Sequence, residues 1–138
     1  MEKPIIALMY DFDKTLCAKD MQEYSFIPSV GMNAGEFWSK ANKIAHDSDM
    51  DKILAYMYLM IKEAKKKEIS IRRESFQALG KDVILYNGVK TWFKRINEFG
   101  KSLGVTIEHY ILSSGLKEII EGTAIASEFK KIYACEFH

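Results

Sequence analysis

Residues 7–17 read Ala-Leu-Met-Tyr-Asp-Phe-Asp-Lys-Thr-Leu-Cys, and this stretch decides the fold. The apolar run from Pro4 to Tyr10 that leads into it lacks the alternation of a half-exposed strand. It predicts a strand covered on both faces, as in a parallel sheet. Asp11 and Asp13 follow directly, and like charges so close repel each other and are costly to bury without a partner. The stretch is therefore either a polar turn or a site for a cation and a transferring group.

The composition indicates a globular protein of about one domain. Of 138 residues, 48% are hydrophobic and 12% aromatic, and 20 basic against 19 acidic side chains leave a net charge of +1. No overall field attracts nucleic acid or an anionic membrane, so neither is expected as a partner. Cys17 and Cys135 lie outside any Cys/His cluster, which argues against a zinc site or a disulfide scaffold. Without a signal peptide or a membrane-length apolar run, a soluble cytoplasmic protein is expected.

Residues 17–86 predict a helical block. A capping-box pattern begins at Asn33 and precedes apolar residues at helical spacing. A helix from about Met50 to Lys66 is apolar nearly all round and is expected to be buried in its own layer. Ser70 is expected to cap a third, short helix that ends at Gly80.

Helix and strand patterns alternate after residue 86. The spacing of apolar residues predicts an amphipathic helix from Val89 to about residue 100 or 104, then a strand at 105–112 and a turn at 113–115. A further helix opens at Leu116, and residues 132–137 form another strand pattern. A strand, a helical block and then helix, strand, helix, strand is an α/β order with one large insertion.

Polar side chains follow two of the predicted strands. Asp11 and Asp13 come after the first strand, and Ser113 and Ser114 come after the next core strand. In open α/β sheets, ligands bind beyond the carboxyl ends of the strands, and helix-end amides there favour an anion. A hard cation such as Mg²⁺, which prefers oxygen ligands, would offset the repulsion between the carboxylates and a phosphate. The carboxylate pair is therefore explained by a metal-bound phosphoryl group.

These residues resemble a known family. Asp-Phe-Asp-Lys-Thr-Leu at 11–16 is similar to the first motif, Asp-x-Asp-x-Thr, of the haloacid dehalogenase-like hydrolases. The strand pattern ending at Ser113 resembles the second motif, and Asn-Gly-Val at 87–89 resembles the return from a cap to the core. A helical cap between the two motifs is similar to the phosphoserine phosphatase-like branch.

The resemblance implies a partial Rossmann-like, three-layer α/β core with a parallel sheet. Residues 1–16 and 87–138 would form this core, and residues 17–86 the inserted helical cap. The implied activity is magnesium-dependent hydrolysis of a small phosphomonoester through an aspartyl-phosphate.

The same resemblance assigns roles to individual residues. Asp11 would be the nucleophile and a magnesium ligand. Asp13 would protonate the leaving oxygen and then activate water, while its backbone carbonyl binds the metal. Ser113 would bind a phosphoryl oxygen, and the remaining phosphate-binding residues would be Thr15, Ser114 and Gly115.

The sequence departs from the family pattern, because the third-motif lysine and the fourth, acidic motif have no counterpart in it. We therefore expect a truncated part of a longer protein, with the edge of the first strand open to association. One alternative is a catalytically silent fragment that binds a partner or forms a homodimer through that edge. Another is a phosphotransferase or mutase of the same superfamily. The sequence does not define the substrate or the oligomeric state.

Other polar residues near the motifs have plainer explanations. Asp20 and Glu23 fall where related caps place an acid that contacts the substrate, but ordinary loop polarity is favoured. Arg72 and Arg73 could clamp an anion, yet an exposed helix face is favoured. Ser113 and Ser114, taken alone, would serve as helix caps.

Overall fold

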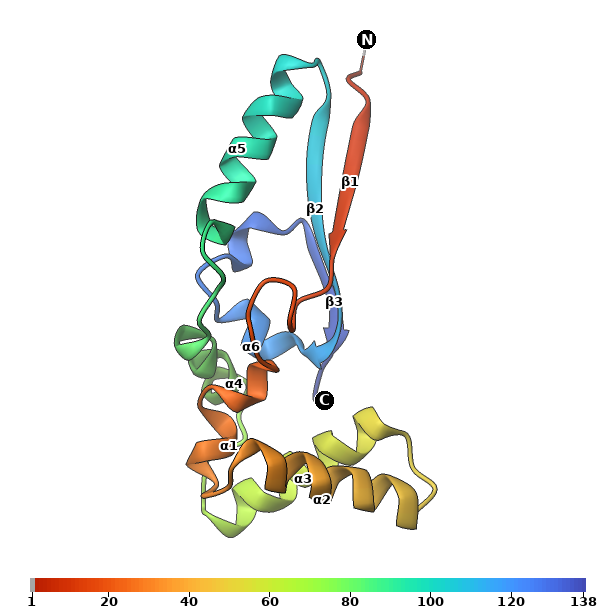
Figure 1. The fold of residues 1–138 in the computed structure, drawn as a ribbon, viewed down its shortest axis with the longest axis vertical. Coiled ribbons are helices and arrows are strands. Elements are labelled where there is room, and N and C mark those ends of the chain that lie inside the picture. The colour runs from red at the N-terminus through yellow and green to blue at the C-terminus, as the bar shows by residue number, and fades with distance from the viewer. Residues whose placement is uncertain (1) are drawn as a thin grey trace.

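A computed structural model describes residues 2–138 as a parallel sheet with a helical layer on one face and a helical pair near the carboxyl ends of the strands (Figure 1). The three strands, in the order β1-β2-β3, are β1 (Ile5–Tyr10), β2 (Thr106–Leu116) and β3 (Lys131–Cys135). The α-helices are α1 (Phe26–Ser29), α2 (Ala34–Asp47), α3 (Lys52–Lys66), α4 (Arg73–Leu79), α5 (Val89–Ser102) and α6 (Lys117–Glu121). Short 3₁₀ helices are η1 (Met21–Glu23), η2 (Gly80–Asp82) and η3 (Ala126–Glu128). The predicted α/β class is confirmed.

β1 and β2 are neighbours in the sheet. They pair in parallel from Ile5 opposite Thr106 to Tyr10 opposite Ile111. Because parallel strands run in one direction, the segments that follow β1 and β2 leave the sheet at the same end. This register brings the two motifs together.

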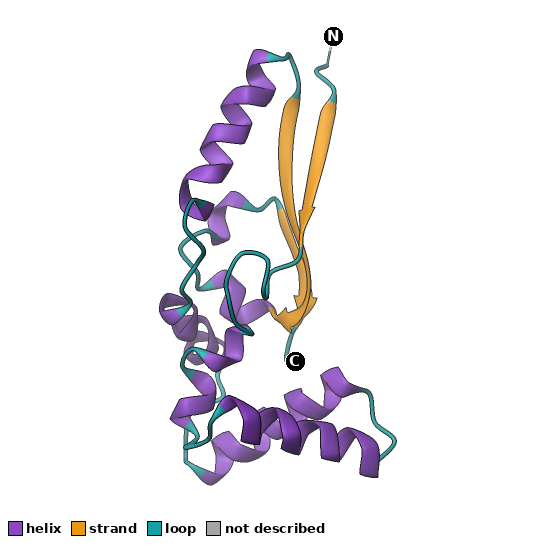
Figure 2. Cartoon of the chain, in the orientation of Figure 1, coloured by secondary structure: helices purple, strands orange, loops and turns teal. Residues whose placement is uncertain are grey.

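Helix α5 covers one face of the sheet (Figure 2). Phe93 on this helix is fully buried and lies edge-on to Tyr10 and His109, with ring centroids 5.8 and 5.0 Å apart. Burial lowers the pKa of His109. Its ring nitrogens lie 2.9 Å from the Tyr10 hydroxyl and 2.7 Å from the Asn97 side-chain oxygen, so it is a hydrogen-bonded core histidine.

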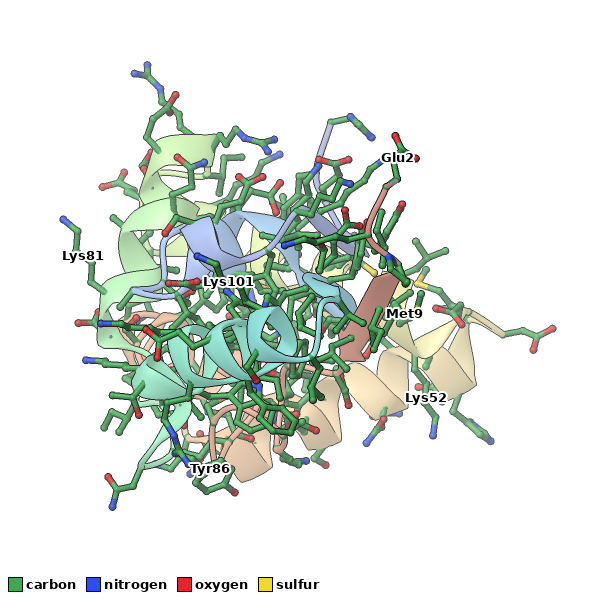
Figure 3. All side chains as sticks on the ribbon, turned by 90° about the horizontal axis from the view of Figure 1, so that it is seen from above. Glu2, Met9, Lys52, Lys81, Tyr86 and Lys101 are labelled. Atoms are coloured by element: carbon green, nitrogen blue, oxygen red, sulfur yellow. The ribbon has the colours of Figure 1, made fainter. Side chains whose placement is uncertain are left out.

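The opposite face of the sheet carries no helix within residues 2–138 (Figure 2). Met9 is 65% exposed and lies on the side of β1 that faces away from α5 (Figure 3). Leu112 and Tyr133 are also exposed. The predicted burial of the first strand on both faces is therefore wrong for the described residues. Of the predicted three-layer core, they form the sheet and one helical layer.

Helices α2 and α3 pack together beyond the strand ends (Figure 1). The capping box is confirmed: the Glu36 N–H donates to the Asn33 side chain at 2.9 Å, and the Asn33 N–H donates to the Glu36 carboxylate at 3.2 Å. The predicted burial of the helix from about Met50 to Lys66, which is α3, is wrong for one of its sides. Leu54 and Tyr58 lie on its outer, exposed face, because a helix in a two-helix layer is covered on one side only. None of the helices within residues 2–138 has the length and apolar character needed to cross a membrane.

Two local predictions are also wrong. Ser70 does not cap α4, which begins at Arg73 after an extended Arg72, and its hydroxyl instead accepts a hydrogen bond from that of Ser75 at 2.7 Å. Residues 113–115 are not a turn but an extended part of β2, which shifts register against β3 between Leu112 and Leu116. Helix α6 therefore begins later, at Lys117, with no side-chain cap.

Helix α4 returns the chain to the core by packing against α6. Gln77 contributes twice to this contact: its side-chain amide donates to the Glu121 carboxylate at 2.9 Å, and its backbone carbonyl lies against Gly122. A Cβ at Gly122 would overlap that carbonyl, so the close approach requires glycine.

Replacing Gly122 with alanine is expected to destabilise the chain by about 2 kcal/mol or more, because backbone atoms cannot move aside as a side chain does. Chemical denaturation of Gly122→Ala, with the exposed Ala124→Ser as the control, measures this. A change below about 0.5 kcal/mol in both variants would contradict the close contact.

Candidate active site

The segment after β1 folds back on itself immediately. The N–H groups of Thr15 and Leu16 donate to the Phe12 carbonyl at 3.2 and 2.9 Å, and Lys14 has a positive φ of 61°. Phe12 is fully buried, whereas Asp11 is exposed and Asp13 is half-buried. The buried ring of Phe12 thus anchors a tight loop, and Asp11 and Asp13 are the residues directly before and after Phe12 in the sequence.

Asp13 has an unusual environment for a carboxylate. Its Oδ1 atom accepts a hydrogen bond from the Met21 N–H at 2.8 Å, which favours the charged form. Burial, helped by the negative charges of Asp20 and Asp11, outweighs that bond and raises the pKa of Asp13 to about 7. Near neutral pH this side chain can therefore both donate and accept a proton, as a general acid–base requires.

Asp11 is the first residue after β1 and begins the same loop. Its Oδ1 atom accepts a hydrogen bond from the Phe12 N–H at 2.8 Å, which fixes one oxygen next to the backbone. The side chain is exposed, so it is accessible to a ligand.

The second motif lies beside this loop as extended backbone. Ser113 Oγ accepts a hydrogen bond from the Gly115 N–H at 3.0 Å, and the Ser114 carbonyl accepts one from the Tyr56 hydroxyl of α3 at 2.7 Å. The Met21 side chain occupies the place that a Cβ of Gly115 would take. The glycine therefore lets the loop after β1 pack directly on β2, and Tyr56 ties α3 to the same strand.

A cavity of about 250 Å³ lies between these loops and the α2–α3 pair. Its core side is lined by Asp13, Asp20, Gln22, Ser114 and Gly115, and its helical side by Trp38, Ala41, Asn42, Lys52, Ile53 and Tyr56. The structure thus brings three of the predicted site residues to one cavity: Asp13, Ser114 and Gly115.

Three other predicted site residues do not line this cavity. Ser113 directly precedes the cavity residue Ser114, and Asp11 lies two residues before the cavity residue Asp13. The negative charge of Asp11 helps to raise the pKa of Asp13. Thr15 instead borders a separate depression with Tyr10 and Trp92 at the start of α5. Its predicted role in phosphate binding gains no geometric support.

Three polar residues near the motifs, Asp20, Glu23 and Arg73, form ion pairs or hydrogen bonds with other side chains of the chain. Asp20 lines the cavity, but its carboxylate pairs with the Lys14 ammonium at 3.2 Å. Glu23 accepts the indole N–H of Trp38 at 2.8 Å, so this carboxylate positions a cavity wall. Arg73 pairs with Glu121 of α6 at 3.1 Å and does not line the cavity.

Sequence reasoning missed the helical side of the cavity. Tyr56 and Trp38 fall within the apolar patterns of the two predicted helices, and such patterns are typical of core packing. Asn42 and Lys52 carry no motif at all. The hydrogen bond from Tyr56 to Ser114 spans 58 positions of the chain, and no local pattern reveals a contact at that separation.

The donors of the site fit a magnesium ion in part. Asp11 offers a carboxylate oxygen and Asp13 a backbone carbonyl oxygen, and Mg²⁺ prefers oxygen ligands of this kind. Within residues 2–138, however, no group of three or more acidic, His or Cys side chains lies close enough to hold a metal ion. Because Mg²⁺ usually keeps several waters and binds substrate phosphate, these two oxygens would form part of a magnesium site and not the whole of it.

Comparisons with known proteins were made for sequence and for fold. The sequence matches no protein-family profile. It is 29% identical over 145 residues to an uncharacterized protein from Borreliella burgdorferi, a match that covers 96% of this chain and 50% of that protein. The fold is similar to that of a HAD family hydrolase from Salmonella enterica serovar Typhi, with a TM-score of 0.61, 19% identity, and coverage of 99% of this chain and 42% of that one. A phosphoserine phosphohydrolase-like protein from Francisella tularensis matches with a TM-score of 0.57, 20% identity, and coverage of 96% and 58%.

These similarities define the class of fold. The chain has the α/β fold of the haloacid dehalogenase-like (HAD) hydrolases, as its two motifs predicted. It spans about half the length of the curated relative that it matches. The division into a core at 1–16 and 87–138 and a cap at 17–86 stays a prediction.

The raised pKa of Asp13 predicts a pH-dependent stability. The folded chain favours the neutral form of the Asp13 carboxyl. The stability that this preference contributes is complete below the ordinary pKa of 3.8, and it is lost as the pH rises to about 7. Between pH 4 and pH 8, the free energy of unfolding should therefore fall in the natural chain relative to Asp13→Asn, by no more than about 4 kcal/mol. Urea denaturation at a series of pH values measures the difference. Parallel pH profiles of the two chains would show that Asp13 titrates normally.

Proposed function

We propose that this chain supplies the nucleophile and the general acid–base of a magnesium-dependent phosphohydrolase that acts on a small phosphomonoester. The observation that carries the proposal is Asp13, a carboxyl group with a pKa of about 7 that lines a cavity at the strand ends. A carboxyl of that pKa donates a proton to a leaving alcohol at neutral pH, which an ordinary aspartate does poorly. The fold shared with a HAD family hydrolase and a phosphoserine phosphohydrolase-like protein supports the same class of reaction.

In the proposed mechanism the two aspartates act in succession. A carboxylate oxygen of Asp11 attacks phosphorus while the bond from phosphorus to the ester oxygen breaks, and the leaving oxygen takes the proton of Asp13. Water then attacks the phosphorus of the aspartyl-phosphate and gives a proton to the Asp13 carboxylate. The bond from phosphorus to the Asp11 oxygen breaks, inorganic phosphate leaves, and both side chains return to their starting states.

The surroundings assist each step. Ser113, whose hydroxyl lies at the end of β2, would donate a hydrogen bond to a phosphoryl oxygen. Asp11, with the backbone carbonyl of Asp13, would hold the magnesium ion, which neutralises phosphate charge when bound. The α2–α3 pair closes one side of the cavity and limits the access of water, which strengthens the electrostatics inside.

The proposal extends to groups outside residues 1–138. The chain covers 50% of its curated relative and 42% and 58% of the two solved structures. A lysine for the phosphate and further acidic metal ligands would come from the rest of a longer protein, which we place in the cytoplasm. In that protein the same aspartates would do the chemistry described here.

The direct test is the hydrolysis of p-nitrophenyl phosphate with Mg²⁺ by the longest chain that the gene encodes. We expect Asp11→Asn to reduce turnover to the background level, because an amide cannot form the covalent intermediate. Asp82→Asn, which removes an exposed carboxylate outside the cavity, serves as the control and should leave turnover unchanged. Turnover that survives in Asp11→Asn and still depends on Mg²⁺ would rule out Asp11 as the nucleophile.

A phosphotransferase or mutase would use the same covalent step but deliver the phosphoryl group to a hydroxyl instead of water. Identification of the phosphorylated product in the presence of added alcohols separates the two reactions. Free inorganic phosphate as the main product supports hydrolysis.

The exposed sheet favours a second candidate function, a module that forms a homodimer through the β1 edge. Ile5 and Met9 of this strand are 60% and 65% exposed, and β1 pairs with a strand on one side only. Unpaired strand edges of this kind associate readily.

Sedimentation velocity over a range of concentrations tests that candidate. We expect a dimer of residues 1–138 that Met9→Lys weakens, whereas Tyr58→Lys on the outer face of α3 does not. A monomer at every concentration would exclude dimerisation as the role of this surface.

A further inference from the structure

We propose that Met21 is a positioning residue for the group that protonates the leaving alcohol. Its thioether is held against the end of β2, and this fixes the backbone N–H that holds the Asp13 carboxyl in place. The inference rests on the proposed phosphohydrolase function and adds to it a residue that acts through Asp13.

The backbone of Met21 holds the carboxyl. Its N–H donates a hydrogen bond to Oδ1 of Asp13 at 2.8 Å. A protonated carboxyl oxygen accepts hydrogen bonds less well than the carbonyl oxygen beside it. When Asp13 is neutral, its proton is therefore carried by Oδ2. The bond thus decides both where the carboxyl lies and which of its oxygens donates the proton.

The side chain of Met21 is held by the backbone at the end of β2. Its sulfur accepts a hydrogen bond from the N–H of Leu116 at 3.3 Å. The sulfur and the terminal methyl also occupy the space beside Gly115, where a Cβ would overlap them. Met21 is 1% exposed and Leu116 is fully buried, so water does not substitute for these contacts.

The two contacts connect the acid to the phosphate-binding end of the proposed site. Gly115, on which the Met21 side chain packs, donates its N–H to Oγ of Ser113 at 3.0 Å. Ser113 is the proposed donor to a phosphoryl oxygen. Met21 therefore sets the distance between the group that protonates the leaving oxygen and the group that binds the phosphoryl oxygen. A misplacement of about 1 Å in such a pair lowers a rate by up to about 100-fold.

Methionine suits this position better than other apolar residues of its size. Its chain is unbranched and flexible, so it fits an irregular gap such as the one beside Gly115. Its sulfur is a weak acceptor, which gives the buried N–H of Leu116 a partner. Leucine has a similar volume, but it is branched and has no acceptor. The exchange of Met21 for leucine therefore disturbs the position of the N–H, yet it belongs to the best tolerated changes in a core, so the variant is expected to fold.

The test compares two phosphate esters whose leaving groups differ in their need for a proton. p-Nitrophenolate is a stable anion and leaves without a proton, whereas the alkoxide of glycerol 2-phosphate needs one. The kcat/KM of each ester is measured with Mg²⁺ in the longest chain that the gene encodes. In Met21→Leu we expect kcat/KM to fall about tenfold for glycerol 2-phosphate and less than about threefold for p-nitrophenyl phosphate. Met60→Leu makes the same exchange at a fully buried position of α3 and should leave the ratio of the two values unchanged.

A second measurement checks the geometry without a variant and without turnover. Methionine is labelled with ¹³C at its methyl group, and nuclear Overhauser effects are recorded by NMR in the same chain. We expect an effect between the Met21 methyl group and the α-protons of Gly115, because the two groups are in contact.

The outcomes separate this inference from the proposed function. An unchanged ratio in Met21→Leu, or a fall of the ratio that is as large in Met60→Leu, overturns the role of Met21 and leaves the phosphohydrolase proposal intact. The absence of the Overhauser effect does the same, since the side chain would then lie elsewhere. If the natural chain hydrolyses neither ester, the phosphohydrolase proposal fails together with the inference.

Discussion

β1 pairs in parallel with β2 from Ile5 to Tyr10, so the polar loop after β1 lies beside the part of β2 that continues beyond this pairing. The site depends on this pairing. It brings the loop of Asp13 next to the extended backbone of Ser114 and Gly115, and the absence of a side chain at Gly115 lets Met21 of that loop pack on β2. The hydrogen bond from Tyr56 to the Ser114 carbonyl then fixes the α3 helix over the same point. The sheet, the loop after β1 and the α2–α3 pair therefore meet around one cavity.

The chemical character of the site follows from partial burial. Packing of the loop takes Asp13 out of water, and one backbone hydrogen bond from Met21 does not compensate for the lost hydration. Asp11, on the other side of the buried Phe12, stays exposed. Two carboxylates one residue apart thus have different environments, and different environments are what separate a proton donor from a nucleophile.

The sequence predicted the parts of the fold that local patterns encode. The run before Asp11, the amphipathic spacing from Val89 to Phe99 and the capping box at Asn33 correspond to β1, α5 and the start of α2. The predictions from the sequence were wrong where the burial of a residue depends on distant parts of the chain. The apolar residues of β1 predicted two covered faces, but composition does not reveal which neighbour covers them, and Met9 is exposed. Ser113 to Gly115 suggested a turn, whereas they continue β2 as an irregular extended stretch between two points of pairing with β3, at Leu112 and at Leu116.

The candidate site also contains some residues that the sequence predicts and others that it does not. Asp13, Ser114 and Gly115 could be predicted because each belongs to a short motif that comes directly after an apolar run in the sequence. Trp38 of α2 and Lys52 of α3 line the cavity together because α2 packs on α3, and this packing has no local signature in the sequence. The helical side of the cavity is therefore the part of the site that sequence patterns describe least well.

The central claim is that Asp13 holds a proton near neutral pH at the mouth of this cavity. A titration of the ¹³C-labelled aspartate carboxyl groups by NMR, with Asp13→Asn used to assign the signal, tests it most directly. The account predicts that the Asp13 carboxyl titrates with a pKa of about 7. Titration at the ordinary value of 3.8 would contradict it, since Asp13 would then be charged at neutral pH and unable to act as the acid.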